Sequence, residues 1–182
     1  MNPKAETSVV FTGGFLDPGK EATAANALLE QGVDVLGVIV DSPITVVQTA
    51  EKRGAYSVGY HYLGVQKFAP KGWISGVAFT WGNLYTRFAR KVMDGTWKSE
   101  NILGGLGDDY LTIAAFGPAV PDDVVKLVNA AKLEFTSGKR QVFQGPIRDN
   151  KGLERVKAGE AFPLTELRKM DWLVEGVVGQ PK

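Results

Sequence analysis

The chain has 182 residues, of which 21 are basic and 20 acidic, and its formal net charge is +1. Without a block or an excess of one charge, binding to nucleic acid or to an anionic membrane by bulk electrostatics is disfavoured. The sequence holds no cysteine and one histidine, which excludes thiol catalysis, thiolate zinc sites and disulfides. No apolar stretch reaches membrane-spanning length, and the polar start 1–8 does not read as a signal peptide.

The first third of the chain is typical of parallel-sheet units, because apolar runs of strand length alternate with capped helices. Asp17 suits an N-cap, and Pro18 then takes the first helical position, where its missing N–H costs nothing. The expected strands are Val9–Thr12, Val33–Val40 and Ala55–Gly59, and the expected helices run from Pro18 until Gly32 and over Ile44–Arg53.

The rest of the chain alternates less regularly. An extended segment, Trp73–Phe79, leads into a helix over about Thr80–Met93, and a later helix begins at Pro121 with acidic residues in its first turn. The further expected elements are a strand at Tyr110–Phe116, a short strand at Arg140–Phe143, a hairpin or loop over Gln144–Gly159, a short helix capped by Thr165, and an apolar segment at Trp172–Val178.

These elements predict an α/β fold with a mainly parallel, Rossmann-like sheet and helices on both faces. Ligands of such sheets bind beyond the carboxyl ends of the strands. The turns at that edge are Gly13–Asp17, Asp41–Pro43 and Gly59–Tyr62. Asp41 and Ser42 can reach a ligand there, although turn formation explains them equally well, and Gly59 would let a ligand approach the backbone closely.

Short motifs run through nearly the whole chain in a fixed order, beginning with an aromatic residue before Asp-Pro-Gly-Lys-Glu and an Ala-rich helix. Each motif is weak alone, whereas the ordered set is specific. They are Phe15-Leu16-Asp17-Pro18-Gly19-Lys20-Glu21, Gly32-Val33-Asp34-Val35, Asp41-Ser42-Pro43, Trp81-Gly82, Asp94-Gly95-Thr96-Trp97, Gly104-Gly105-Leu106-Gly107-Asp108, Gly117-Pro118-Ala119-Val120-Pro121, Phe143-Gln144-Gly145-Pro146-Ile147-Arg148-Asp149, and Met170-Asp171-Trp172-Leu173-Val174-Glu175-Gly176-Val177-Val178-Gly179.

This set resembles the second half of the basic membrane protein (BMP) family of ABC-transporter solute-binding proteins. The resemblance implies the second lobe of a type I periplasmic-binding-protein fold, with the first lobe largely missing. It also implies a purine nucleoside or nucleobase as ligand, an ABC permease as partner and a periplasmic or membrane-anchored extracytoplasmic location. No catalysis, cofactor or metal is expected. The implied division is a lobe core at 1–79, a crossover helix with a strand-helix segment at 80–138, and a returning segment at 139–182.

The resemblance also suggests ligand-contacting residues. Phe15 takes the place of an aromatic that stacks on the nucleobase, and the alternative is that it packs locally under its turn. Asp108 takes the place of a carboxylate that binds ribose hydroxyls or base nitrogens, and the alternative is a surface turn, with Asp109 beside it as a second choice. Asp17 is better explained as a helix cap than as a ligand contact.

Two positions depart from the family pattern. His61 stands near a place that is often acidic in relatives, and as the only histidine it is better explained as a surface or interface residue than as a metal ligand or catalyst. Phe79 occupies a crossover position that is often polar. The four tryptophans are expected in the core or in lobe packing: Trp73, Trp81, Trp97 and Trp172.

Two other functions compete with solute binding. An α/β enzyme is possible for this fold class, although the sequence has no nucleophile elbow, dinucleotide glycine pattern, P-loop or histidine–carboxylate constellation. A stand-alone half-receptor could also act as a self-associating structural or regulatory protein. In either receptor form we expect a homo-oligomer, because the Thr80–Met93 helix has an apolar face that must be covered. That face consists of Trp81, Leu84, Phe88 and Val92.

Overall fold

The computed structural model describes residue 2 and residues 4–181. The chain forms two compact units, which we call the central unit (residues 15–137) and the terminal unit (residues 1–14 with 138–182). The predicted division into a lobe core (1–79), a crossover helix with a strand-helix segment (80–138) and a returning segment (139–182) stays a prediction.

The central unit is built on a four-stranded sheet in the order β2 (Val35–Gly37), β3 (Tyr56–His61), β4 (Trp73–Phe79), β5 (Leu111–Ile113). The pairs β2–β3 and β3–β4 are parallel, whereas β5 joins β4 antiparallel. The predicted parallel pairing of the second and third apolar runs is therefore confirmed. The fold is α/β with a mainly parallel sheet.

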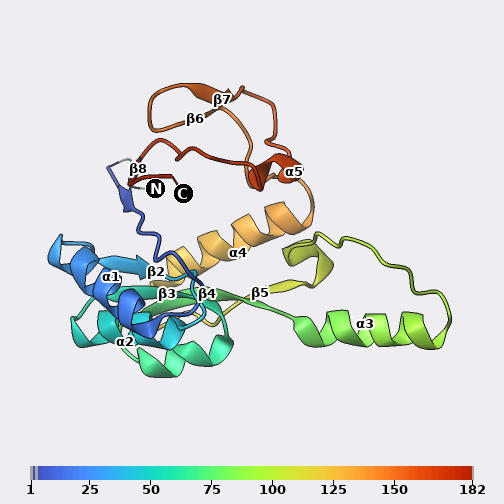
Figure 1. The fold of residues 1–182 in the computed structure, drawn as a ribbon, viewed down its shortest axis with the longest axis horizontal. Helices are drawn as coiled ribbons and strands as arrows, with labels where there is room; N and C mark the ends of the chain where they lie inside the picture. The colour runs from blue at the N-terminus through green and yellow to red at the C-terminus, as the bar shows by residue number, and fades with distance from the viewer. Residues whose placement is uncertain (1, 3, 182) are drawn as a thin grey trace. The chain divides into compact units, whose positions relative to one another are not determined.

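Two helices, α1 (Pro18–Glu30) and α2 (Pro43–Lys52), lie together on one face of this sheet (Figure 1). These two helices and the strands share one apolar core. Burial of such side chains is the main favourable term in folding. A 3-10 helix, η1 (Leu63–Phe68), completes this core with Val65. The buried core residues are Ala25, Leu36, Val38, Val46, Val47, Ala50, Val65, Ala69, Trp73 and Ala114.

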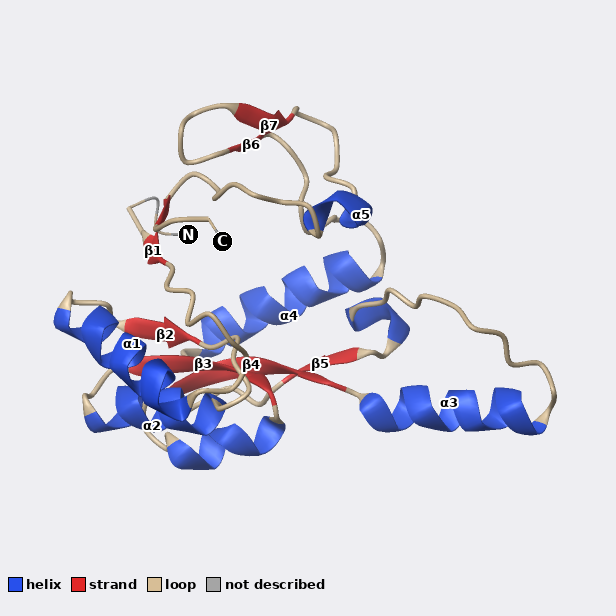
Figure 2. Cartoon of the chain, in the orientation of Figure 1, coloured by secondary structure: helices blue, strands red, loops and turns tan. Residues whose placement is uncertain are grey.

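Two further helices of the central unit make much looser contact. The helix α3 (Trp81–Met93) leads away from the end of β4 (Figure 2), and all of its residues are described but none is buried. The same holds for α4 (Asp122–Thr136), which contacts a 3-10 turn, η2 (Leu106–Asp108). Side chains of the sheet such as Val35 and Tyr56 remain 36% and 43% exposed.

The terminal unit is held by two short pairings. Its strands β1 (Thr7–Ser8) and β8 (Val177–Val178) pair in parallel, and β6 (Ile147–Arg148) and β7 (Glu154–Val156) form an antiparallel hairpin. The hairpin confirms one of the two forms predicted for 144–159. A short helix, α5 (Leu164–Leu167), follows.

Three sequence predictions are wrong in this unit, although every residue concerned is described. Val9–Thr12 is not a strand of the central sheet; instead the Val9 N–H donates to the Val178 carbonyl at 2.9 Å, because tertiary contacts and not local propensity choose a strand's partner. Arg140–Phe143 forms a turn, with pairing limited to a single bridge from Gln144 to Ala161. Thr165 lies inside α5, whose N-cap is Pro163.

Candidate functional site

Asp41 connects the three turns that follow the expected strands at the carboxyl edge of the central sheet. Its backbone N–H donates to the Phe15 carbonyl at 2.7 Å, and its Oδ1 lies 3.3 Å from His61 Nε2. Parallel strands bring their carboxyl ends to one edge, where ligands of open α/β sheets bind. The two contacts of Asp41 bring together the turns that contain Phe15, Asp41 and His61, although no strand of the central sheet precedes the turn of Phe15.

His61 ends β3 in an unusual backbone conformation. Its φ is 69°, which is in the left-handed region that residues other than glycine seldom adopt, although histidine tolerates it better than most. The imidazole lies 4.1 Å from the Tyr60 ring and 5.4 Å from the Phe79 ring, measured between centroids. A strained residue at a ligand edge is an observation from which a functional role can be inferred.

Aromatic side chains continue from this edge along the start of α3, and we call Tyr60, His61, Phe79, Trp81 and Tyr85 the aromatic row. The centroid distance is 5.8 Å from Tyr60 to Phe79 and 4.9 Å from Phe79 to Trp81. Trp81 and Tyr85 are stacked at 5.7 Å with an interplanar angle of 17°. Such spacing is favourable for aromatic pairs, and Trp81 and Tyr85 remain 46% and 61% exposed.

The ring of Phe15 does not pack under its turn, because the residue is 78% exposed. Its backbone carbonyl accepts the Asp41 N–H at 2.7 Å. Ser42 is the N-cap residue of α2, yet within the described chain its hydroxyl makes no capping hydrogen bond. Both side chains are therefore available at the edge.

The segment with Asp108 and Asp109 reaches the same edge through β4. The Thr80 hydroxyl donates to the Asp109 carbonyl, and the Thr80 N–H donates to the Tyr110 carbonyl at 3.0 Å. Asp108 Oδ2 accepts a hydrogen bond from the Gly105 N–H at 2.9 Å. One carboxylate oxygen of Asp108 thus stabilises its own turn.

Gly59 has a packing explanation. A Cβ at this position would lie 2.3 Å from Cη2 of Trp73, so only glycine leaves room for the buried indole. A ligand is not needed to explain this glycine.

Asp17 is a helix cap, as the sequence predicts. Its Oδ1 accepts the Lys20 N–H at 3.0 Å, and this bond holds the pKa of the Asp17 carboxyl below its usual value. In return, the Asp17 N–H donates to Glu21 Oε1 at 3.1 Å. These contacts fix the turn that carries Phe15.

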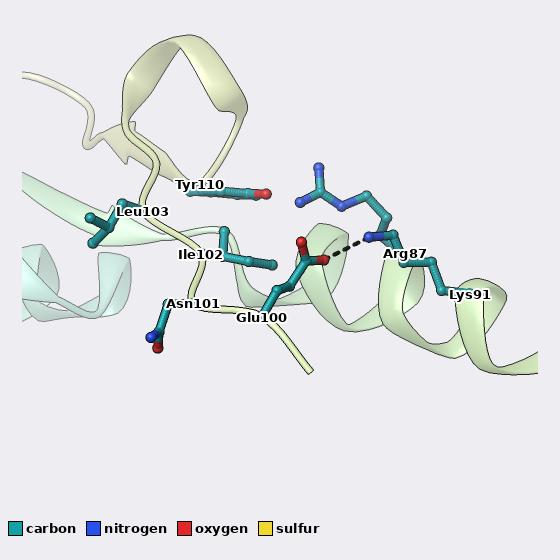
Figure 3. Close-up of a pocket in the computed structure, with 7 residues that line it drawn as sticks. All are labelled: Arg87, Lys91, Glu100, Asn101, Ile102, Leu103 and Tyr110. Carbon is teal, nitrogen blue, oxygen red and sulfur yellow. Dashed lines mark hydrogen bonds and ion pairs between the residues drawn. The ribbon is translucent and has the colours of Figure 1, made fainter. Parts of the chain in front are cut away.

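A hollow of about 440 Å³ lies beside α3 (Figure 3). Two of its charged groups form an ion pair, in which Lys91 Nζ donates to Glu100 Oε1 at 2.7 Å. The Arg87 guanidinium lies 5.0 Å from the Tyr110 ring centroid. The hydrogen bond from Lys91 lowers the pKa of Glu100. We therefore rank this hollow behind the carboxyl edge. Its lining residues are Arg87, Lys91, Glu100, Asn101, Ile102, Leu103 and Tyr110.

The sequence reasoning missed three members of the aromatic row: Tyr60, Trp81 and Tyr85. Trp73 is a core residue as predicted, at 3% exposure, but Trp81 and Trp97 are not, with 46% and 50% exposed. A usable signal was the run of aromatics around the junction of β4 and α3. Among the described residues, no group of three or more acidic or histidine side chains could hold a metal. No helix in the described part of the chain is long and apolar enough to span a bilayer.

Known proteins resemble this chain over nearly its whole length. Residues 1–142 match the family model for ABC transporter substrate-binding proteins of the PnrA-like type (Bmp). A purine-binding protein of Brucella abortus is 38% identical over 177 residues, covering 97% of this chain and 50% of that protein. A putative ABC transporter glucose-binding protein of Haloferax volcanii is 24% identical, covering 99% of this chain and 43% of that protein. The chain thus spans about half the length of these relatives.

Solved structures support the same fold. A transcriptional activator of the comK gene from Bacillus halodurans has a TM-score of 0.65 at 20% identity, covering 71% of this chain and 46% of that one. A solute-binding protein of an ABC transporter system from Conexibacter woesei has a TM-score of 0.55 at 23% identity, covering 73% and 45%. With the match over residues 1–142, the chain belongs to the Bmp family of PnrA-like ABC transporter substrate-binding proteins.

Proposed function

We propose that the chain binds the solute of an ABC importer at the carboxyl edge of its central sheet, that the solute is a purine nucleoside or nucleobase, and that the chain itself performs no catalysis. The aromatic row is the observation that carries the proposal. A purine has a flat π-face, and each base–aromatic stack contributes about 1–3 kcal/mol. The name of the Brucella relative supports the choice of purine over other solutes.

Polar groups at the edge complement the rings. The carboxylates of Asp41 and Asp108 can accept hydrogen bonds from base N–H groups or ribose hydroxyls, and the Ser42 hydroxyl can donate or accept. Phe15, with its exposed ring, gives a second stacking face on the neighbouring turn. Gly59 has the weakest claim, because Trp73 accounts for it.

A solute receptor of this family works with further partners. We propose that this chain supplies one of the two lobes that close on the solute, and that the loaded receptor delivers it to an ABC permease on the extracytoplasmic side of the membrane. Because one lobe makes only part of the contacts, affinity of this chain for a purine should be weak. Neither an enzymatic activity nor a purely structural role has a specific observation in its favour.

The test is solute mapping by NMR, which detects weak binding. Adenosine should shift the amide signals of Phe15 and Phe79 and the indole signal of Trp81, whereas glucose should not. Trp81→Ala should weaken adenosine binding at least about fivefold, the lower range of a base–aromatic stack. Trp97→Ala is the matched control, because Trp97 is equally exposed and lies outside the row. Shifts confined to the hollow of Figure 3, or equal shifts with glucose, would contradict the proposal.

We also propose that two copies of the chain associate through α3. Val92 is 61% exposed and lies on one side of the helix with Leu84 and Phe88, and a contiguous apolar face of this kind is usually an interface. Sedimentation velocity should show a dimer, and Val92→Glu should convert it to a monomer. Thr86→Glu is the control, since position 86 falls on the opposite side of the helix. A monomer at all concentrations would refute the association.

A further inference from the structure

We propose that His61 is a positioning residue of the carboxyl edge: when protonated, it fastens the three turns through Asp41, so that solute affinity rises as pH falls. The inference rests on the proposed function, because it concerns the same solute site. It adds a protonation-dependent link that the aromatic row alone does not require.

The geometry of Asp41 makes such a link. Its N–H binds the Phe15 carbonyl at 2.7 Å, and its carboxylate lies 3.3 Å from His61 Nε2. Asp41 therefore transmits a change in the charge of His61 to the turn that contains Phe15. A charged imidazole attracts a carboxylate more strongly than a neutral one does.

The imidazole is also held by the row. It contacts the rings of Tyr60 and Phe79 at centroid distances of 4.1 and 5.4 Å. The left-handed backbone at His61, with φ 69°, directs the chain out of β3 at this point. Tightening or loosening the bond to Asp41 therefore acts on both stacking faces of the site, that of Phe15 and that of Phe79.

Two other carboxylates at this edge, those of Asp17 and Asp108, are engaged elsewhere. Asp17 caps α1 and pairs with Lys20 at 3.4 Å, and Asp108 binds the Gly105 N–H. Asp109 belongs to the same turn as Asp108, and the Tyr60 hydroxyl belongs to the row. Of these groups, within the described residues, Asp41 is the one that the structure pairs with His61.

The sign of the effect follows from the chemistry of imidazole. Protonation gives the His61 imidazole a positive charge that attracts the Asp41 carboxylate, so the link is stronger at low pH than at high pH. Solvent-exposed ion pairs are weak, and the side chains here are 37% and 50% exposed. We therefore expect adenosine to bind about two- to fivefold more weakly at about pH 8 than at about pH 5.5, which is the range of an exposed pair.

The link itself is tested without any solute, by NMR titration of the full chain. Because His61 is the only histidine, its ring gives one unambiguous signal. The amide signals of Phe15 and Asp41 should titrate with the same midpoint as that ring. In Asp41→Asn and in His61→Asn, where asparagine tolerates a left-handed backbone, the Phe15 amide should no longer titrate there.

Asp34→Asn is the matched control. It removes the same charge from the residue before β2, at the opposite edge of the sheet and well beyond the screening length of about 8 Å at physiological salt. In this variant the coincident titration should persist. If the amide signal of Phe15 in the unmodified chain does not titrate with the midpoint of the His61 ring, the link is overturned.

Adenosine binding, measured at the two pH values, completes the test. Affinity that falls with rising pH in the unmodified chain, and is level in His61→Asn, supports the inference. Affinity that is level or rises with pH in the unmodified chain overturns it. If adenosine does not bind at either pH while the amides still follow His61, the purine proposal fails and the link stands by its own measurement.

Discussion

Helices α2 and α3 both follow strands of the same sheet, yet they meet very different surroundings. α2 returns over the sheet and buries Pro43, Val46, Val47 and Ala50, whereas α3 continues outward and none of its described residues is buried. Neither N-cap residue makes a side-chain capping bond in the described structure. The apolar face of α2 is buried within the central unit and stabilises the fold. The side chains of α3 stay exposed and are available to bind a ligand or another protein.

The contrast explains why the aromatic row lies where it does. A helix whose apolar stripe is covered adds to the core, and its side chains are then closed to a ligand. The start of α3 leaves Trp81 and Tyr85 at 46% and 61% exposure, next to the carboxyl ends of the strands. Substitutions of the same kind in the two regions should therefore separate stability from binding.

The largest expected effect comes from the two tryptophans. Trp73→Ala should lower the free energy of unfolding by about 3–5 kcal/mol, because it empties a buried site and leaves the Ala115 carbonyl without its indole donor. Trp81→Ala should cost at most about 1.5 kcal/mol, the worth of its aromatic pairs. Urea denaturation followed by circular dichroism measures both. Equal losses would break the comparison.

Glycines give the next contrast. Gly59→Ala should destabilise the chain by about 1–3 kcal/mol, because the added Cβ would meet the Trp73 ring at 2.3 Å. Gly82→Ala, in α3, has no atom within 4 Å of its new Cβ and should stabilise by up to about 1 kcal/mol. The same denaturation experiment applies. A neutral Gly59→Ala would mean that Trp73 moves aside freely.

The last contrast concerns two aspartates and extends the comparison to charge. Burial raises the pKa of Asp149, but hydrogen bonds from the Leu153 N–H, the Arg155 guanidinium and the Lys151 N–H outweigh it, so the pKa lies below its ordinary value. A carboxyl whose pKa is lower in the folded state stabilises the fold at pH values above its pKa in the unfolded chain, which is about 3.9 for aspartate. This stabilisation is lost as the pH falls through the pKa of the folded state.

We therefore expect the urea midpoint to be level near neutral pH and to fall below about pH 4, with less of that fall in Asp149→Asn. Asp149→Asn should also be less stable at neutral pH, because a buried amide then faces N–H donors. Asp17→Asn should be nearly neutral, since asparagine caps helices as well as aspartate does. An acid profile of Asp149→Asn identical to that of the unmodified chain would contradict the assignment.

The sequence by itself determined the parallel pairing of the second and third apolar runs, the cap at Asp17 and the family. These features depend on residues that are close together in the sequence and on their order. They are apolar runs, N-cap residues and motifs such as Gly104–Asp108, which can be recognised in the sequence alone. The apolar face of α3 was also predictable, because helical periodicity reveals which side chains share a face.

Only the tertiary structure decided which distant residues meet. Val9 pairs with Val178, Gly59 makes room for Trp73, and Asp41 joins Phe15 to His61. The rings of Phe79 and Trp81 lie 4.9 Å apart with the Tyr60 ring 5.8 Å from Phe79, an arrangement that no local sequence pattern predicts. Local sequence patterns specify backbone conformation and amphipathic faces. Which distant segments contact one another is decided by packing across the fold, and no short stretch of sequence reveals it.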